Sequence, residues 1–172
     1  MSNIISRRNI IKISASAISM LPFSASAKKN IHTFSWKGFA LGNPVEMNLH
    51  TKNKIHLEKI LFLVTSEINR LDKIFYLQNG YSKINLLNKN KIILNPDIEL
   101  INAIYLSEKF FKISKGSFDI TIQPLWNSYS SGEKLNLDGI GFNNIDISKR
   151  KISLLNKHTE LTLNSLSQGI LT

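Results

Sequence analysis

Apolar residues recur at three- and four-residue spacing in two long stretches of the chain. The first stretch runs from His56 to Phe75, and the second runs from Asn95 to about Ser114. This period places the apolar side chains on one face of a helix, so the sequence predicts two amphipathic helices. The second helix is expected to begin with Asn95 as its N-cap and Pro96 in its first position, and to end at Gly116.

Alternating apolar and polar residues predict strands before and after these helices. A β-hairpin is expected between Ile31 and His50, where Val45, Met47 and Leu49 alternate along the second strand. Three short antiparallel strands are expected between Asn144 and Asn164, from the pairs Ile145/Ile147, Ile152/Leu154 and Leu161/Leu163. The sequence therefore predicts an α+β fold, in which an antiparallel sheet packs with two amphipathic helices.

The composition is typical of a globular protein with one domain. The chain has 172 residues, of which 42% are hydrophobic and 20% are charged. The absence of cysteine excludes disulfides, thiolate metal ligands and a catalytic thiol. The net charge of +10 comes from scattered lysines without an arginine cluster or interleaved aromatic residues, so no nucleic-acid partner is expected. The positive charge favours smaller anions, such as a diphosphate.

Residues 1–27 are expected to form an export signal outside the folded domain. Arg7 and Arg8 precede a short apolar stretch from Ile13 to Phe23, and Ala25-Ser26-Ala27 supplies a cleavage site of small residues. Paired arginines at this position are typical of twin-arginine signals, which carry folded proteins to the periplasm. The alternative is an ordinary secretory signal that contains two arginines. Both interpretations give an exported protein without a stable membrane anchor.

The segment GSFDITIQPLW, residues 116–126, carries the most informative chemistry. A helix is expected to stop on its glycine, and the chain then turns into a strand that its proline ends. Asp119 lies just past the turn, where a carboxylate accepts hydrogen bonds from sugar hydroxyls or a base amine. The alternative is structural, with a glycine cap, a buried Phe118 and an Asp119 that only supports the backbone. The polar residues Ser128 to Gly132 predict a loop.

A second segment, Leu163 to Gly169, places small polar residues and a glycine directly after a predicted strand. Such residues let the backbone approach a ligand closely and start a helix at a phosphate group. An ordinary N-cap is the structural alternative. The chain stops at Thr172, where this helix would be starting, so we expect the sequence to be incomplete as a functional unit.

Four blocks of the sequence together resemble the ApbE family, the FAD:protein FMN transferases. The most specific block is residues 116–126, which fits the pattern G-x-F-D-x-T-x-x-P-L-W, and Leu163 to Gly169 resembles a second family block. Trp36 to Gly42 and Glu67 to Phe75, with the later Ser82 and Leu87-Asn88, are similar to the family's opening strand and helix. Residues 28–172 thus look like the N-terminal part of an ApbE-like FAD-binding catalytic domain, incomplete at its C-terminus.

The resemblance implies a phosphoryl transfer. Family members bind FAD with Mg²⁺, and a threonine hydroxyl of an acceptor flavoprotein attacks the FMN phosphorus and expels AMP. Catalysis then rests on positioning and on charge neutralisation by the metal. On matching positions Ser117, Phe118, Asp119 and Asn164 would contact FAD, and the backbone carbonyl of Ser167 would bind Mg²⁺.

The sequence also departs from the family pattern. Leu41 stands where many members have a flavin-contacting methionine, and Gln78 stands where many have an aromatic residue. The family's catalytic and metal-binding side chains would lie beyond Thr172, so the catalytic residues are unknown and little or no transferase activity is expected from this chain alone. The alternative function is a non-catalytic exported remnant that binds FAD or another nucleotide.

Overall fold

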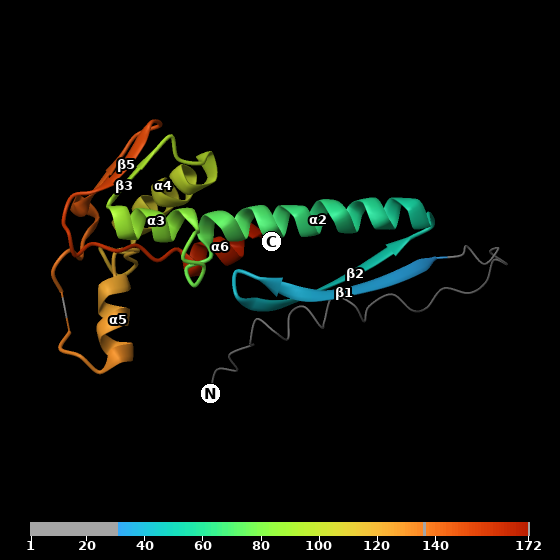
Figure 1. Cartoon of the computed structure of the whole chain (residues 1–172), viewed down its shortest axis with the longest axis horizontal. Helices are drawn as coiled ribbons and strands as arrows, with labels where there is room; N and C mark the ends of the chain where they lie inside the picture. The colour runs from blue at the N-terminus through green and yellow to red at the C-terminus, as the bar shows by residue number, and fades with distance from the viewer. Residues whose placement is uncertain (1–30, 136, 172) are drawn as a thin grey trace. The chain divides into compact units, whose positions relative to one another are not determined.

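The computed structural model describes residues 31–135 and 137–171. The chain divides into two units after Ile31. All described helices and strands belong to the second unit (Figure 1). The export signal predicted at residues 1–27 lies outside the described residues, so it stays a prediction.

The second unit opens with the predicted β-hairpin. β1 (His32–Ala40) pairs antiparallel with β2 (Asn43–Thr51). Leu41 and Gly42 form the connecting turn, with positive φ angles of 52° and 78°, which is the pattern of a type I′ turn. A Cβ atom on Gly42 would lie 2.7 Å from the ring of Tyr76, so both the φ angle and the close approach require glycine.

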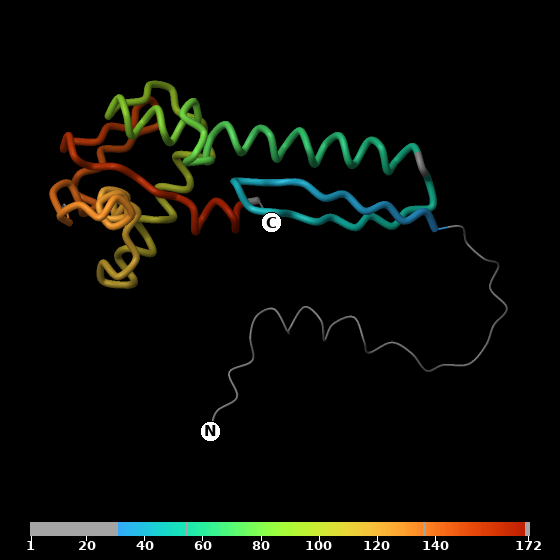
Figure 2. Tube along the Cα trace, turned by 60° about the horizontal axis from the view of Figure 1, so that its bottom comes forward, coloured from blue at the N-terminus to red at the C-terminus, as the bar shows by residue number. Residues whose placement is uncertain are grey.

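The hairpin runs alongside α2 (Lys54–Phe75), which confirms the first predicted helix (Figure 1 and Figure 2). The helix begins at Lys54 because the Asn53 side chain caps it, accepting a hydrogen bond from the Ile55 N–H at 2.9 Å. A further bond attaches the hairpin turn to this helix: the Leu41 N–H donates to Asp72 Oδ1 at 2.7 Å. The turn is therefore fixed near the C-terminal end of α2.

The next helix in the chain is α3 (Lys83–Asn90), which Ser82 caps. β3 (Ile92–Leu94) follows it and was not predicted, because three residues are too short for a recognisable alternation. α4 (Ile98–Ile113) confirms the second predicted helix, but its predicted N-cap is wrong.

Asp97 takes the N-cap position of α4, and Asn95 lies outside the helix with a φ angle of 48°. The Asn95 N–H donates to the Arg150 carbonyl at 2.8 Å. Asn95 therefore belongs to the turn that leaves β3, and Pro96 precedes the helix instead of starting it.

The segment after α4 differs from the predicted strand and loop. Residues 114–121 form turns, and α5 (Gln123–Ser131) then begins with Pro124 in its first turn. Proline is tolerated there because the first N–H groups of a helix have no partner within the helix. Pro124 thus helps to start a helix instead of ending a strand. The loop predicted at Ser128–Gly132 is also wrong, because its first four residues complete α5 and Gly132 is the C-cap, with a φ angle of 71°.

A three-stranded antiparallel sheet lies beside α3 and confirms two of the three strands predicted in this region. β5 (Lys151–Leu154) is its central strand, and β3 and β4 (Ile145–Ile147) are its edges. A short 3-10 helix, η1 (Phe142–Asn144), precedes β4.

The third predicted strand, at Leu161 and Leu163, does not form. Glu160 instead makes an isolated parallel bridge with Ile122, and the Thr162 N–H donates to the Ile120 carbonyl at 2.8 Å. Ile120 and Ile122 belong to an irregular segment, so the pairing does not continue into a β-sheet. The chain then enters α6 (Asn164–Leu171), so the helix predicted in this block forms, but it begins at Asn164, earlier than the predicted start near Thr172.

The core lies where α2, α3, α4 and β5 meet. Its largest fully buried side chains share an aliphatic or aromatic character, and they include Phe75, Ile84, Leu87, Leu100, Ile104, Ile152, Leu161 and Leu163. The described residues form a mixed α and β structure with antiparallel sheets and five α-helices, which confirms the predicted α+β class. Within the described ranges, each helix is too short or too polar to cross a lipid bilayer.

Candidate functional site

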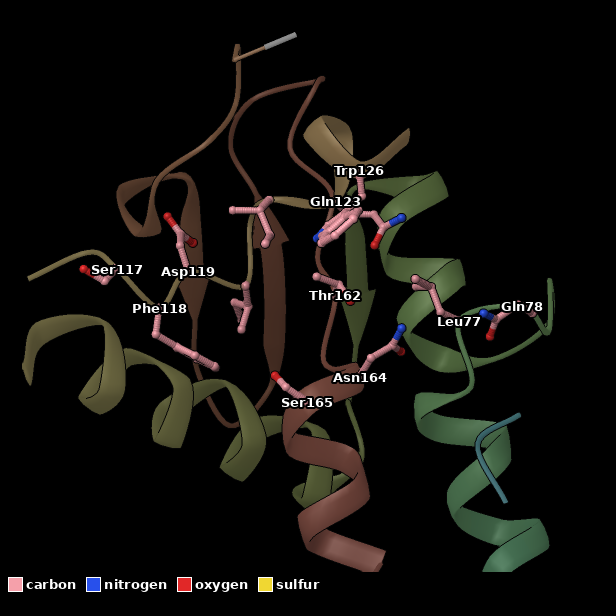
Figure 3. A pocket seen from close by; sticks show the side chains of 12 residues that line it. Leu77, Gln78, Ser117, Phe118, Asp119, Gln123, Trp126, Thr162, Asn164 and Ser165 are labelled. Atoms are coloured by element: carbon pink, nitrogen blue, oxygen red, sulfur yellow. The ribbon is translucent and has the colours of Figure 1, made fainter. Parts of the chain in front are cut away.

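A pocket of about 500 Å³ opens where the two informative segments of the sequence meet (Figure 3). Ser117, Phe118 and Asp119 lie on one side of it, and Asn164 lies at the first turn of α6. The structure thus brings together the four residues predicted to contact FAD, although 45 residues separate Asp119 from Asn164. This volume falls within the range of about 300–1,000 Å³ that is typical of small-molecule sites.

Asp119 lines the pocket and also has a structural partner. Its Oδ1 accepts two hydrogen bonds from Thr121, from the N–H at 2.8 Å and from the hydroxyl at 2.7 Å. Thr121 is fully buried, and its hydroxyl oxygen accepts a bond from the Gly141 N–H at 2.7 Å. These contacts hold the carboxylate in one orientation, and both bonds from Thr121 go to Oδ1. The structural and ligand-binding interpretations of Asp119 are therefore compatible.

Aromatic side chains form much of the apolar lining of the pocket. Phe118 is half-buried and meets the ring of Phe110 edge to face, with 5.8 Å between the ring centroids. Trp126 lies across the pocket on α5, is 57% exposed, and meets Tyr129 edge to face at 6.4 Å. Exposed aromatic rings beside aliphatic side chains are suited to contact a flat ring system.

The first turn of α6 supplies polar groups to the same pocket. Asn164 and Ser165 are both exposed there, and Figure 3 places them between the Phe118 side and the Leu77 and Gln78 side. The N-terminal turn of a helix carries partial positive charge and N–H groups that have no partner within the helix. An anionic group of a ligand would therefore be stabilised at this turn.

Residues 159–163 form an extended strap that holds the α6 turn in place. The buried Asn88 side chain donates to the Leu161 carbonyl at 2.9 Å and accepts from the Leu161 N–H at 2.7 Å. Lys91 Nζ donates to the Thr159 carbonyl at 2.8 Å. Burial lowers the pKa of Lys91, and the negative charge of Glu160 opposes that shift in part. These bonds fix the strap to Asn88 on α3 and to Lys91, the residue that follows α3.

Sequence analysis missed several residues that line the pocket. Leu77, Gln123, Thr162 and Ser165 contribute to the lining but were not among the predicted contacts. Gln123 and Ser165 lie inside the two segments that the sequence singled out, so their positions could have been inferred. Leu77 and Thr162 gave no local signal, because only the tertiary fold brings them to this site.

The described residues do not by themselves form a magnesium site. Ser167 is buried within α6, and its N–H donates to the Leu163 carbonyl at 2.8 Å. Among residues 31–135 and 137–171, no three His, Asp or Glu side chains lie close enough together to hold a metal ion. A single backbone carbonyl does not satisfy Mg²⁺, which requires near-octahedral oxygen coordination. The predicted role of the Ser167 carbonyl stays a prediction.

The sequence matches the model of the ApbE family over residues 41–172. The chain belongs to the ApbE family. Its fold is similar to that of the flavin transferase ApbE from Vibrio cholerae, with a TM-score of 0.67 and 11% sequence identity. The ApbE protein from Thermotoga maritima gives a TM-score of 0.67 at 17% identity, and the apo flavinyl transferase ApbE from Pseudomonas stutzeri gives 0.66 at 17% identity.

The chain spans about half the length of these solved ApbE structures. The matches cover 82%, 81% and 82% of this chain but only 51%, 50% and 50% of the Vibrio, Thermotoga and Pseudomonas chains. At these identities the likeness establishes the fold. A search of curated proteins finds no match.

Proposed function

We propose that this chain supplies the FAD-binding part of an FAD:protein FMN transferase. The observation that carries the proposal is the pocket itself. Ser117, Phe118 and Asp119 come from one family block and Asn164 from another, and all four line one cavity of about 500 Å³. Membership of the ApbE family and the flavin transferase structures with the same fold support this function.

The described residues would bind and orient the dinucleotide. A flat ring of the ligand would lie against Phe118 and Trp126, where aromatic side chains line the pocket. Asp119 Oδ2 would accept hydrogen bonds from hydroxyl or N–H groups of the ligand, while Oδ1 stays bonded to Thr121. The diphosphate would lie at the first turn of α6, beside Asn164.

The proposed reaction transfers FMN to a threonine of an acceptor flavoprotein. The threonine oxygen forms a bond to the FMN phosphorus, the bond from that phosphorus to the bridging oxygen breaks, AMP leaves with that oxygen, and the threonine proton is released to solvent. When Mg²⁺ is bound, it neutralises charge on the transferred phosphoryl group. Because the described residues do not form a metal site, this chain's own contribution is to hold FAD in position.

A second candidate function is FAD binding without transfer. The lack of an acidic cluster among the described residues favours it, because a transferase needs side-chain ligands for the metal. One experiment distinguishes the two. The chain is incubated with FAD, Mg²⁺ and a threonine-bearing acceptor protein, and the denatured acceptor is inspected for covalent flavin fluorescence. Labelled acceptor supports transfer. FAD binding by equilibrium dialysis without labelling supports the second function, and no FAD binding contradicts both.

We also propose that the protein is exported to the periplasm by a twin-arginine signal. The support is the Arg7-Arg8 pair ahead of a short apolar stretch, together with the small residues that precede position 28. Cell fractionation of an epitope-tagged chain tests it. The double substitution Arg7→Lys and Arg8→Lys should retain the protein in the cytoplasm, whereas continued export would support an ordinary secretory signal.

A further inference from the structure

α5 and the segment that follows it form an apolar pocket of about 380 Å³. Leu125, Trp126 and Tyr129 on α5 line this pocket, together with Leu135 beyond the end of the helix. Tyr129 is 74% exposed and Leu135 is 54% exposed. Single exposed apolar side chains are common on protein surfaces, but four that line one cavity are typical of an interaction site.

Contacts on the other side of α5 hold this apolar surface in place. Pro124 and Ser128 are the buried residues of the helix, and the Ser128 hydroxyl donates to the Pro124 carbonyl at 3.0 Å. Asn127 attaches the helix to the strap, because its Nδ2 donates to Glu160 Oε2 at 2.8 Å. The two exposed aromatic rings also contact each other edge to face. A partner therefore meets a surface that is already ordered, which lowers the entropy cost of binding.

The composition of α5 favours a protein partner over a lipid surface. The helix has the sequence QPLWNSYSS, which contains no charged residue. A helix that binds a lipid surface is typically rich in Lys and Arg on its polar face. Trp and Tyr, in contrast, are enriched among the residues that contribute most of the binding energy of protein interfaces. The pocket is therefore suited to an apolar side chain of another protein.

Trp126 joins this apolar pocket to the pocket proposed to bind FAD. Its side chain lines both cavities, and Figure 3 shows it across the FAD pocket from Phe118. In the proposed reaction the acceptor threonine must reach the FMN phosphorus, so the acceptor chain passes over the mouth of the FAD pocket. A side chain close to that threonine in sequence then comes within reach of the apolar pocket, since an extended chain advances about 3.3–3.6 Å per residue.

We propose that the apolar pocket on α5 is the docking site for the acceptor flavoprotein, and that it takes an aliphatic or aromatic side chain a few residues from the target threonine. This inference rests on the proposed function. Burial of that side chain against Tyr129 and Leu135 supplies affinity. The separation of the two pockets fixes how far from this side chain the threonine lies in the acceptor sequence. The pocket thereby selects which threonine is modified.

Synthetic peptides test this docking without the whole acceptor. Each peptide carries one threonine in a chain of glycine and serine, and leucine replaces serine at one position before or after the threonine. Fluorescence anisotropy of a dye on the peptide gives its Kd for the wild-type chain in saturating FAD. Leucine at the correct distance should lower this Kd by about tenfold or more, as expected for burial of its side chain. Equal affinity for leucine and serine at every position would overturn the proposal.

Two substitutions in the pocket lining test where the leucine binds. Tyr129→Ala removes one wall of the apolar pocket, and Leu135→Asp places a charge in it. Each should raise the Kd of the leucine peptide to that of the serine peptide but leave the Kd for FAD unchanged, because neither residue lines the FAD pocket. The matched controls are Tyr81→Ala and Leu155→Asp, at exposed side chains outside the apolar pocket, which should change neither value. Equal effects in variants and controls would overturn the assignment to this pocket.

The remaining outcomes separate this inference from the proposed function. FAD binding in equilibrium dialysis without any preference for leucine overturns the docking site alone, and the proposed function stands. Absence of FAD binding to the wild-type chain contradicts the proposed function, whatever the peptides do. Dimerisation in analytical ultracentrifugation that Tyr129→Ala abolishes would assign the pocket to a second copy of the chain and overturn acceptor docking. Far-UV circular dichroism of all variants should match the wild type, so that lost folding is not mistaken for lost docking.

Discussion

Asn88 and Leu161 exchange a reciprocal pair of hydrogen bonds, although 73 positions separate them in the chain. The Asn88 amide donates to the Leu161 carbonyl and its oxygen accepts from the Leu161 N–H, which is how two strands of a sheet would pair. A side chain on α3 thus replaces the neighbouring strand that the segment lacks. These two bonds hold the strap, residues 159–163, against α3. The strap leads directly into α6, so the bonds also help to position the start of α6.

Removing this side chain should destabilise the fold. Asn88→Ala leaves the buried N–H and carbonyl of Leu161 without partners, and each unsatisfied group costs about 1–3 kcal/mol. We expect the free energy of unfolding, measured by urea denaturation, to fall by about 2–5 kcal/mol. Asn90→Ala at the exposed end of the same helix is the control and should cost less than about 0.5 kcal/mol. Similar losses in both variants would contradict the role of the Asn88 bonds.

The two roles of Asp119 can be separated by two substitutions. Asp119→Asn keeps the oxygen that accepts both bonds from Thr121 but removes the charge offered to a ligand. It should leave the free energy of unfolding nearly unchanged and raise the Kd for FAD by about tenfold or more. Asp119→Ala should lose FAD affinity and also about 1–3 kcal/mol of stability. Unchanged FAD affinity in both variants would leave Asp119 with only its structural role.

The parts of the fold that the sequence predicted have strong local signals. The spacing of apolar residues in α2 and α4 and the alternation in β1 and β2 are properties of consecutive residues, and they place the helices and the hairpin correctly. The block around Asp119 likewise gave the pocket residues Ser117 and Phe118 from a short motif. These predictions needed no knowledge of distant contacts.

The errors occur where distant partners decide the local structure. Asn95 has the sequence of a helix cap, but its N–H bonds to Arg150, so the helix starts later. Leu161 and Leu163 alternate like a strand, but the partner of Leu161 is the side chain of Asn88. The sequence predicts that Pro124 ends a strand, but Pro124 lies in the first turn of α5. Proline is common both at helix starts and at strand ends, so the residue alone does not distinguish them.

Two glycines with positive φ angles test how closely the strap is packed. Gly139 has a φ angle of 81°, and a Cβ atom there would lie 2.6 Å from the Thr159 backbone nitrogen. Gly132 has a φ angle of 71°, but a Cβ atom there would meet open space. Both alanine variants should lose about 1–2 kcal/mol through the left-handed backbone.

Only Gly139→Ala adds a steric conflict with the strap. Its free energy of unfolding should therefore fall by a further 1–3 kcal/mol or so relative to Gly132→Ala, as for overpacking in a core. The Kd for FAD should also rise in Gly139→Ala. Thr162 belongs to the strap and lines the pocket, so a displaced strap would change the shape of the pocket. Equal losses in the two variants would show that the strap moves aside without cost.

Arg70 on α2 forms two ion pairs, one with Glu67 on its own helix and one with Glu99 on α4. Arg70 on α2 holds Glu67 through Nε at 2.9 Å and Nη2 at 2.8 Å, and its Nη2 lies 2.7 Å from Glu99 Oε1 on α4. The hydrogen bond from Arg70 lowers the pKa of Glu67 below its ordinary value of 4.5. A lowered carboxylate pKa adds stability that is present above the ordinary value and is lost as the pH falls through the lower folded-state pKa.

Arg70→Ala should therefore lower the melting temperature at pH 7 but have a smaller effect at an acidic pH below the lowered pKa of Glu67, where Glu67 is protonated in the folded chain as well. The effect should be small at either pH and should shrink in high salt, because these side chains are exposed and solvent screens exposed ion pairs. Lys59→Ala, at an exposed site on the same helix, is the control and should show no such pH dependence. A difference between wild type and Arg70→Ala that stays constant as the pH falls from 7 through the lowered pKa of Glu67 would mean that Arg70 stabilises the helices by packing its alkyl chain and not by its charge.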